Sequence, residues 1–196
     1  MSVTRRVVIR GLGRFNKFHW RRGIVLKPAI VAVVAFVLAS WPALAQSPLP
    51  AVDVTTAEVK AFIDKLPKDR ISDSPIRVAD VGGYKVGVYG VFRPKALPGG
   101  AIAHDTSVTE IYYMLEGTGT LVTGGTLVDR RSTGVSPNTG RQNYGGSKID
   151  GGKSRQVVPG DIIIIPGKVP HWWSSLDSDI KYVIYRPDPE GLQTVK

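Results

Sequence analysis

From residue 84 onward, the chain is divided into short runs of β-forming residues separated by Gly and Pro. The 196 residues include 22 Gly and 14 Pro, and pairs such as Gly124-Gly125, Pro159-Gly160 and Pro166-Gly167 stand between the runs as turn signals. Strands are predicted over residues 84–92, 111–115, 118–122, 155–158, 161–165, 172–176 and 180–186. Many short strands at this spacing predict a β-sandwich or a barrel.

One short helix is predicted before the β region. Thr55 and Glu58 have the Thr-x-x-Glu spacing of a capping box. Apolar residues then follow at i, i+3, i+4 and i+7, and Pro67 ends the helix. Residues 129–153, rich in Gly, Ser, Asn and basic residues, are interpreted as a long mobile loop and not as a strand pair. The isoleucine run 162–165 is interpreted as a fully buried strand.

The first 45 residues differ from the rest in charge. They hold eight of the 26 Lys and Arg and no Asp or Glu, whereas residues 46–196 hold the other 18 and all 16 acidic residues, a net charge of +2. A basic stretch, an apolar run over 29–39 and Ala43-Leu44-Ala45 follow in the order typical of a cleavable signal peptide. The apolar run, about 11 residues, is shorter than the roughly 20 needed to span a bilayer.

We therefore predict a signal peptide over 1–45, a periplasmic or secreted mature protein, and no stable membrane insertion after cleavage. Arginine pairs at 5–6 and 21–22 fit a twin-arginine signal as well as ordinary signal-peptide arginines.

The composition excludes several kinds of function. Because the basic excess belongs to the leader, a nucleic-acid-binding face has no support in the rest of the chain. The chain has no Cys, which excludes disulfides, iron–sulfur clusters, thiolate metal sites and cysteine nucleophiles. Of its three His residues, only His104 and His171 lie beyond the leader.

Both of these histidines lie in longer motifs. Residues 98–117 run from a Gly-rich turn through His104 and Glu110 to Gly117, and residues 160–171 read Gly-Asp-Ile-Ile-Ile-Ile-Pro-Gly-Lys-Val-Pro-His. The first segment resembles the first cupin motif and the second resembles the second. The resemblance to the cupin superfamily implies an all-β double-stranded β-helix, a jelly-roll barrel, preceded here by the short N-terminal α-helix. We expect the helix in an extension over 46–80 and the barrel over 81–190.

The resemblance also implies a metal site, with one ligand missing. Cupins usually offer a second His in the first motif, where this chain has Thr106. The expected ligand set is therefore His104, Glu110 and His171, and the expected cofactor is a divalent metal ion (Fe, Mn, Ni or Zn). Ser175 replaces an Asn that closes the second motif.

Strand geometry supports the same site independently. If residues 104–114 form one continuous strand, alternate side chains share a face. That face would hold His104, Thr106, Val108, Glu110, Tyr112 and Met114. His171 would likewise share a face with Trp173 and Ser175. Two imidazoles and a carboxylate suit a divalent ion with open positions, and the ion would offset the cost of burying the carboxylate. The candidates that would line the pocket are Thr106, Met114, Trp173 and Ser175.

Three functions follow from this interpretation, and the sequence leaves all three open. The favoured one is an exported metalloenzyme acting on a small molecule as a dioxygenase, isomerase or lyase, with Tyr112 as the candidate catalytic side chain. The second is a non-catalytic periplasmic protein that binds a small molecule. The third is an assembly role in which Trp172 or Trp173 forms an interface. Exposed sheet edges also predict a homodimer.

Overall fold

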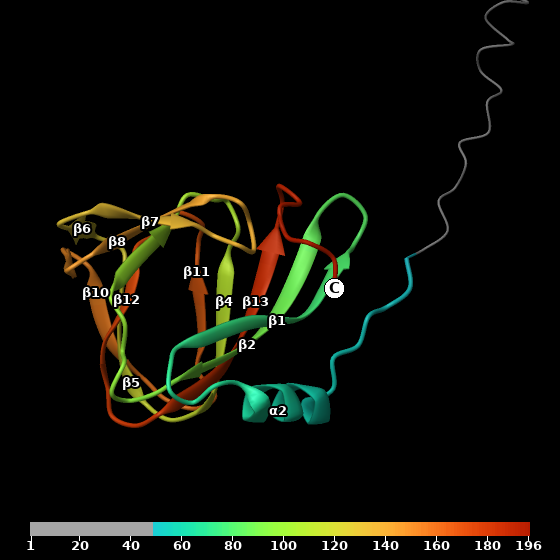
Figure 1. The fold of residues 1–196 in the computed structure, drawn as a ribbon, viewed down its shortest axis with the longest axis horizontal. Coiled ribbons are helices and arrows are strands. Elements are labelled where there is room, and N and C mark those ends of the chain that lie inside the picture. Colours follow the sequence, from blue (N-terminus) through green and yellow to red (C-terminus); the bar gives the residue numbers. More distant parts are fainter. Residues whose placement is uncertain (1–48) are drawn as a thin grey trace, which may run out of the picture. The chain divides into compact units, whose positions relative to one another are not determined.

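Two antiparallel sheets face each other and enclose the main hydrophobic core (Figure 1). The computed structural model describes residues 49–196, so the predicted signal peptide lies outside the described residues. One sheet has the strand order β1-β2-β13-β4-β11 and the other β10-β5-β12-β3-β8-β7, while β6 and β9 form a separate pair. The strands are β1 (Ser72–Asp80), β2 (Lys85–Arg93), β3 (Ala101–His104), β4 (Glu110–Glu116), β5 (Gly119–Thr123), β6 (Thr126–Val128), β7 (Arg131–Val135), β8 (Gln142–Gly146), β9 (Lys148–Asp150), β10 (Lys153–Val157), β11 (Ile162–Ile165), β12 (His171–Leu176) and β13 (Ile180–Asp188). The predicted all-β jelly-roll barrel with one short helix is confirmed.

Strand alternation fills the space between the sheets. On β13, Tyr182, Ile184 and Arg186 are buried, and on β4 Tyr112 and Met114 are buried. These alternate positions face the interior because successive side chains of a strand point to opposite sides of its sheet. The apolar members of this set form one core cluster with side chains from both sheets. Arg186 is the exception, a charged residue at a core position.

The helix α2 (Thr56–Lys65) packs on the outer face of the first sheet. Thr55 caps it through the predicted reciprocal bonds with Glu58, and Leu66 ends it before Pro67. Ile63 and Leu66 are buried against Phe92 of β2. A Cβ added at Gly90 would lie only 2.9 Å from Ile63, so the glycine permits this close approach. Within residues 49–196 no helix is long and apolar enough to cross a membrane.

The barrel extends beyond the predicted bounds of 81–190. β1 pairs with β2 along its whole length, which places residues 72–80 in the sheet and not in the extension. At the other end, the backbone of Lys196 exchanges two hydrogen bonds with that of Val78, and Gln193 is fully buried.

The prediction of a loop over residues 129–153 is wrong. The segment forms β7, β8 and β9, and β8 pairs with β3 directly beside His104. Its polar and Gly-rich sequence lacks strand periodicity because β7 lies exposed at a sheet edge. Pairing with β3, and not an intrinsic β preference, makes these residues extended.

The prediction that Ile162–Ile165 is fully buried is also wrong. Ile163 and Ile165 are buried, but Ile162 is 63% exposed and Ile164 is 66% exposed. β11 is the edge strand of its sheet, and only its inward face meets the core.

This alternation gives a test of the barrel. We expect Ile163→Ala to lower the free energy of unfolding by about 2–5 kcal/mol, because it leaves a cavity in the core. In the monomer, the adjacent Ile162→Ala should change it by no more than about 0.5 kcal/mol, because this side chain is exposed there. Urea denaturation of both variants in dilute solution measures the difference, and equal losses would contradict the assigned inward face.

Candidate metal centre

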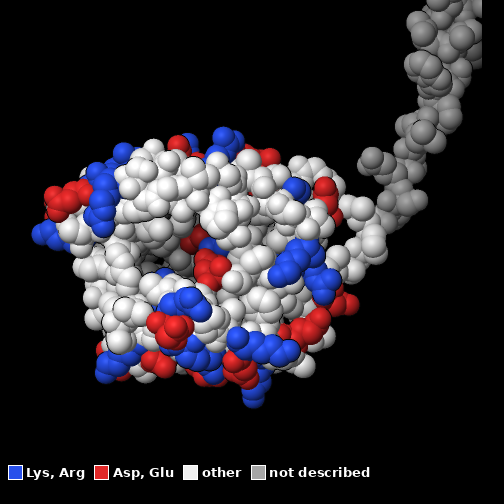
Figure 2. All heavy atoms as spheres, viewed as in Figure 1, with Lys and Arg blue, Asp and Glu red and all other residues white. Residues whose placement is uncertain are grey.

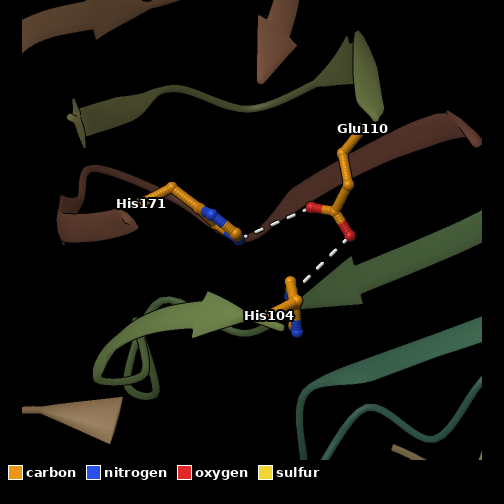
Figure 3. Close-up of side chains that lie close together, drawn as sticks. All are labelled: His104, Glu110 and His171. Atoms are coloured by element: carbon orange, nitrogen blue, oxygen red, sulfur yellow. Dashed lines mark ion pairs between the residues drawn. The ribbon is translucent and has the colours of Figure 1, made fainter. Parts of the chain in front are cut away.

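Three side chains from strand ends meet inside the barrel (Figure 3). His104 is the last residue of β3, Glu110 the first of β4 and His171 the first of β12. The histidines belong to one sheet and Glu110 to the other. The Nε2 atom of His104 lies 3.8 Å from Glu110 Oε1, and that of His171 lies 3.5 Å from Glu110 Oε2. One donor atom from each of the three residues falls within 4.8 Å of the others.

The two motifs are brought together by a close backbone contact. Gly167, in the turn before His171, packs against residues 106–107, which precede Glu110. A Cβ at Gly167 would lie 2.4 Å from the carbonyl oxygen of Thr106. Any larger residue would therefore separate the turn of the second motif from the loop of the first.

The fold is that of a cupin. His104 and Glu110 of the first motif and His171 of the second converge between the facing sheets, as the motif resemblance implied.

Among known proteins, only solved structures are similar to this chain. No family model and no curated protein matches the chain. Similar solved structures include the DMSP lyase DddQ of Ruegeria pomeroyi, with 16% identity and a TM-score of 0.40 over 83% of this chain and 91% of that one. A cupin superfamily protein of Desulfitobacterium hafniense has 12% identity and a TM-score of 0.39, covering 72% of this chain and 96% of its own. The EutQ protein of Clostridium difficile has 13% identity and a TM-score of 0.35, over 71% and 77%. These values assign no activity to this chain.

Hydrogen bonds fix both imidazoles in the form that binds metals. His104 Nδ1 lies 2.7 Å from Asn143 Oδ1, and His171 Nδ1 lies 3.1 Å from the carbonyl oxygen of Val169. Oxygen acceptors at both Nδ1 atoms place the ring protons there and leave the Nε2 lone pairs facing Glu110. Burial lowers the pKa of His171, although the nearby Glu110 opposes it, so this ring is neutral at pH 7.

The carboxylate of Glu110 is held by a cation that the sequence interpretation missed. Arg186 donates to Glu110 Oε1 from Nε at 3.0 Å and from one terminal nitrogen at 2.7 Å, and it also binds Asp73. Burial alone would raise the pKa of the Glu110 carboxyl, but Arg186 and the two histidines outweigh burial and hold that pKa well below its usual range. Tyr112 donates its hydroxyl to Glu110 Oε2 at 3.0 Å.

Arg186 could have been found from the sequence, since it falls in register with the inward positions Tyr182 and Ile184 of an apolar strand. Asn143 could not, because it lies in the segment interpreted as a loop.

The condition for this alternation, one continuous strand over 104–114, does not hold, because the chain leaves the sheet after His104 and re-enters it at Glu110. Glu190 holds the intervening segment by accepting from the Ser107 amide at 2.9 Å. Thr106 is buried in this segment, and its hydroxyl accepts from the Val108 amide. It nevertheless lines a cavity that His104 and Glu110 also line.

The other pocket candidates divide between the cavity and the core. Trp173 lines a cavity of about 240 Å³ together with all three candidate ligands. Met114 packs in the main core cluster. Ser175 is exposed, and its placement beside His171 and Trp173 is wrong because a register shift between Trp173 and Ser175 ends the alternation. Charged side chains gather at a hollow in the face of the barrel shown in Figure 2.

The hydrogen bond from Asn143 predicts a measurable effect on metal affinity. We expect Asn143→Ala to weaken zinc binding by roughly 10–100-fold, because the His104 ring loses the group that orients it. Gln156→Ala removes an amide on β10 that binds Asp177, and it should leave the affinity unchanged. Zinc titration against a competing chelator compares the two, and equal affinities would refute the role of Asn143.

Proposed function

We propose that this chain is an exported, metal-dependent enzyme that acts on a small molecule inside the cupin barrel. The observation that carries the proposal is the convergence of His104, Glu110 and His171 on the wall of a cavity of about 240 Å³. A larger cavity of about 380 Å³ between α2 and the sheet is lined by no histidine. The charge pattern and Ala-x-Ala sequence of residues 1–45 support export.

The donor set fits a divalent ion. Atoms bound to one ion at about 2.0–2.2 Å lie at most about 4.4 Å apart, so the distances of 3.5 and 3.8 Å from the histidines to Glu110 suit a shared ion. Oε2 of Glu110 keeps a lone pair after accepting from Tyr112, whereas Oε1 accepts two hydrogen bonds from Arg186. Two imidazoles and one carboxylate are typical of iron, manganese, nickel or zinc sites.

The surrounding residues define the chemistry. A bound ion would supply Lewis acidity to a substrate atom. Burial and the neighbouring Glu110 raise the pKa of Tyr112 well above its usual value, so its hydroxyl keeps its proton and donates a hydrogen bond to Glu110. This favours Tyr112 as a hydrogen-bonding group over a general base. Dioxygenase, isomerase and lyase chemistry are all compatible with this site.

A second candidate is a binding protein that uses no metal. Glu110 already accepts three hydrogen bonds, two from Arg186 and one from Tyr112, so its charge is compensated without an ion. In that case the same cavity would hold a small molecule without converting it.

Metal analysis separates the two candidates. We expect untagged protein purified from the exported fraction to contain a near-stoichiometric divalent metal by elemental analysis, and its N-terminal sequence to begin near Gln46. His104→Ala and His171→Ala should each lose most of the metal, because each removes a direct ligand. Glu110→Gln should lose less, because it keeps an oxygen donor.

The variants must keep the wild-type circular dichroism spectrum for this comparison. A wild-type protein that binds divalent metals no more tightly than His104→Ala would exclude the metalloenzyme and leave the binding protein.

An apolar patch on the outer face of the first sheet supports the proposal of a homodimer. Ile162 and Ile164 of β11 pair with Tyr113 and Ile111 of β4, and Tyr185 of β13 lies opposite Ile111, so the five share one face. Among the described strands β11 pairs only with β4, which leaves its other edge open. An open antiparallel edge is self-complementary about a two-fold axis. A second copy of the chain is therefore the proposed occupant.

We expect wild-type protein to be a dimer by light scattering and Ile164→Lys to be a folded monomer, because a charge in the patch opposes its burial. Val135→Lys adds the same charge at an equally exposed position of the other sheet and should remain dimeric. A wild-type protein that is monomeric at all concentrations would contradict the dimer.

A further inference from the structure

Two buried N–H donors in the candidate cavity lack acceptors. Within residues 49–196, neither Arg93 Nε nor Trp173 Nε1 has a hydrogen-bond partner. Both side chains line the cavity that also contains His104, Glu110 and His171. Trp173 is 2% exposed, so its indole N–H does not form a hydrogen bond with bulk solvent. Buried donors are almost always paired in folded proteins, and an unpaired one costs free energy. These two unpaired N–H donors therefore indicate a ligand that supplies the acceptor atoms.

Arg93 also has no carboxylate partner among the described residues. It ends β2, a terminal nitrogen donates to the carbonyl oxygen of Pro98 at 2.5 Å, and the guanidinium also lies beside the Tyr182 hydroxyl. No Asp or Glu among the described residues forms an ion pair with it, whereas Arg186 in the same cavity binds both Asp73 and Glu110. Of the two guanidinium groups, Arg93 is the one with free capacity for an anion.

The charges of the cavity do not repel an anion. Asp73 and Glu110 carry two negative charges, and Arg93 and Arg186 carry two positive charges. The balance is neutral before any ion is bound, and a divalent cation on the triad would make it positive. An incoming anion would thus meet a neutral or positive site.

We propose that this cavity binds a small carboxylate whose oxygens accept hydrogen bonds from Arg93 Nε and Trp173 Nε1. The guanidinium fork matches the planar geometry of a carboxylate. A volume of about 240 Å³ is below the roughly 300–1,000 Å³ of sites for drug-sized ligands, so the ligand has few heavy atoms. The inference deepens the proposed function by naming its substrate class, and it rests on that proposal only for the view that the ligand is converted.

Calorimetric titration of untagged protein with propionate and with its neutral isostere propionamide tests the proposal. We expect propionate to bind more tightly than propionamide, in metal-free protein and in protein loaded with zinc. Arg93→Gln should weaken propionate binding by about 10–100-fold, the loss expected for a hydrogen bond to a charged group. Arg93→Lys should keep part of the affinity because it keeps the charge. Trp173→Phe, which removes the indole donor but keeps an aromatic ring, should weaken binding by about 2–10-fold.

Arg77→Gln is the matched control. Arg77 is a half-buried arginine of β1 whose Nε also lacks a partner within residues 49–196, but it pairs with Glu58 and does not line this cavity. It should bind propionate like the wild type. Equal binding of propionate and propionamide, wild-type affinity in Arg93→Gln, or no propionate binding in either form of the protein would overturn the proposal. If Arg93→Gln does not fold, the Arg93→Lys and Trp173→Phe variants decide the question by the same criteria.

The outcome is separable from that of the proposed function. Protein that holds no metal yet binds propionate through Arg93 would exclude the metalloenzyme and support this inference. Protein with a full complement of metal and no affinity for propionate would do the reverse.

Discussion

The ion pair between Arg186 and Glu110 is the interaction on which the rest of the site depends. Glu110 is buried between two sheets, where an isolated carboxylate would be strongly destabilised. Arg186 places a guanidinium against it and is itself neutralised further by Asp73. Because all three charges are paired, the barrel can keep a charged group among aromatic and aliphatic side chains. Removing one member of such a cluster would leave an uncompensated charge.

The positive charge of Arg186 has two effects on the site. Arg186 keeps Glu110 ionised, and an ionised carboxylate is the form that binds a cation. It also compensates part of the negative charge of Glu110, so a metal ion at the histidines would share this carboxylate with the guanidinium. Thr106 stands where the first cupin motif usually has a second His, and its hydroxyl accepts a hydrogen bond from the Val108 amide in the local turn. Affinity for the metal is therefore expected to depend on the orientation of the two imidazoles, which Asn143 and Val169 set.

The strands with apolar alternation could be predicted from the sequence, and those without it could not. β2, β4, β12 and β13 have enough β-branched and aromatic residues to be recognised, and the capping box and Pro67 marked the two ends of α2. β8 is polar and rich in glycine, and it is extended because β3 supplies its hydrogen bonds. For the isoleucines of β11, the prediction failed in the opposite way, because the structure is a strand but is not fully buried. Their composition indicates burial, but an edge strand buries only one face.

The candidate ligands and the class of fold could be predicted from the sequence alone. Motif spacing is a local property of the chain, and only two histidines lie beyond the leader. His104, Glu110 and His171 needed no coordinates to be named. The tertiary structure decided the partners of those ligands. Arg186 lies 76 positions from Glu110, Asn143 lies 39 from His104, and Arg93 and Trp173 come from different sheets. Distances between such residues follow from strand pairing and sheet packing, which no short segment of sequence specifies.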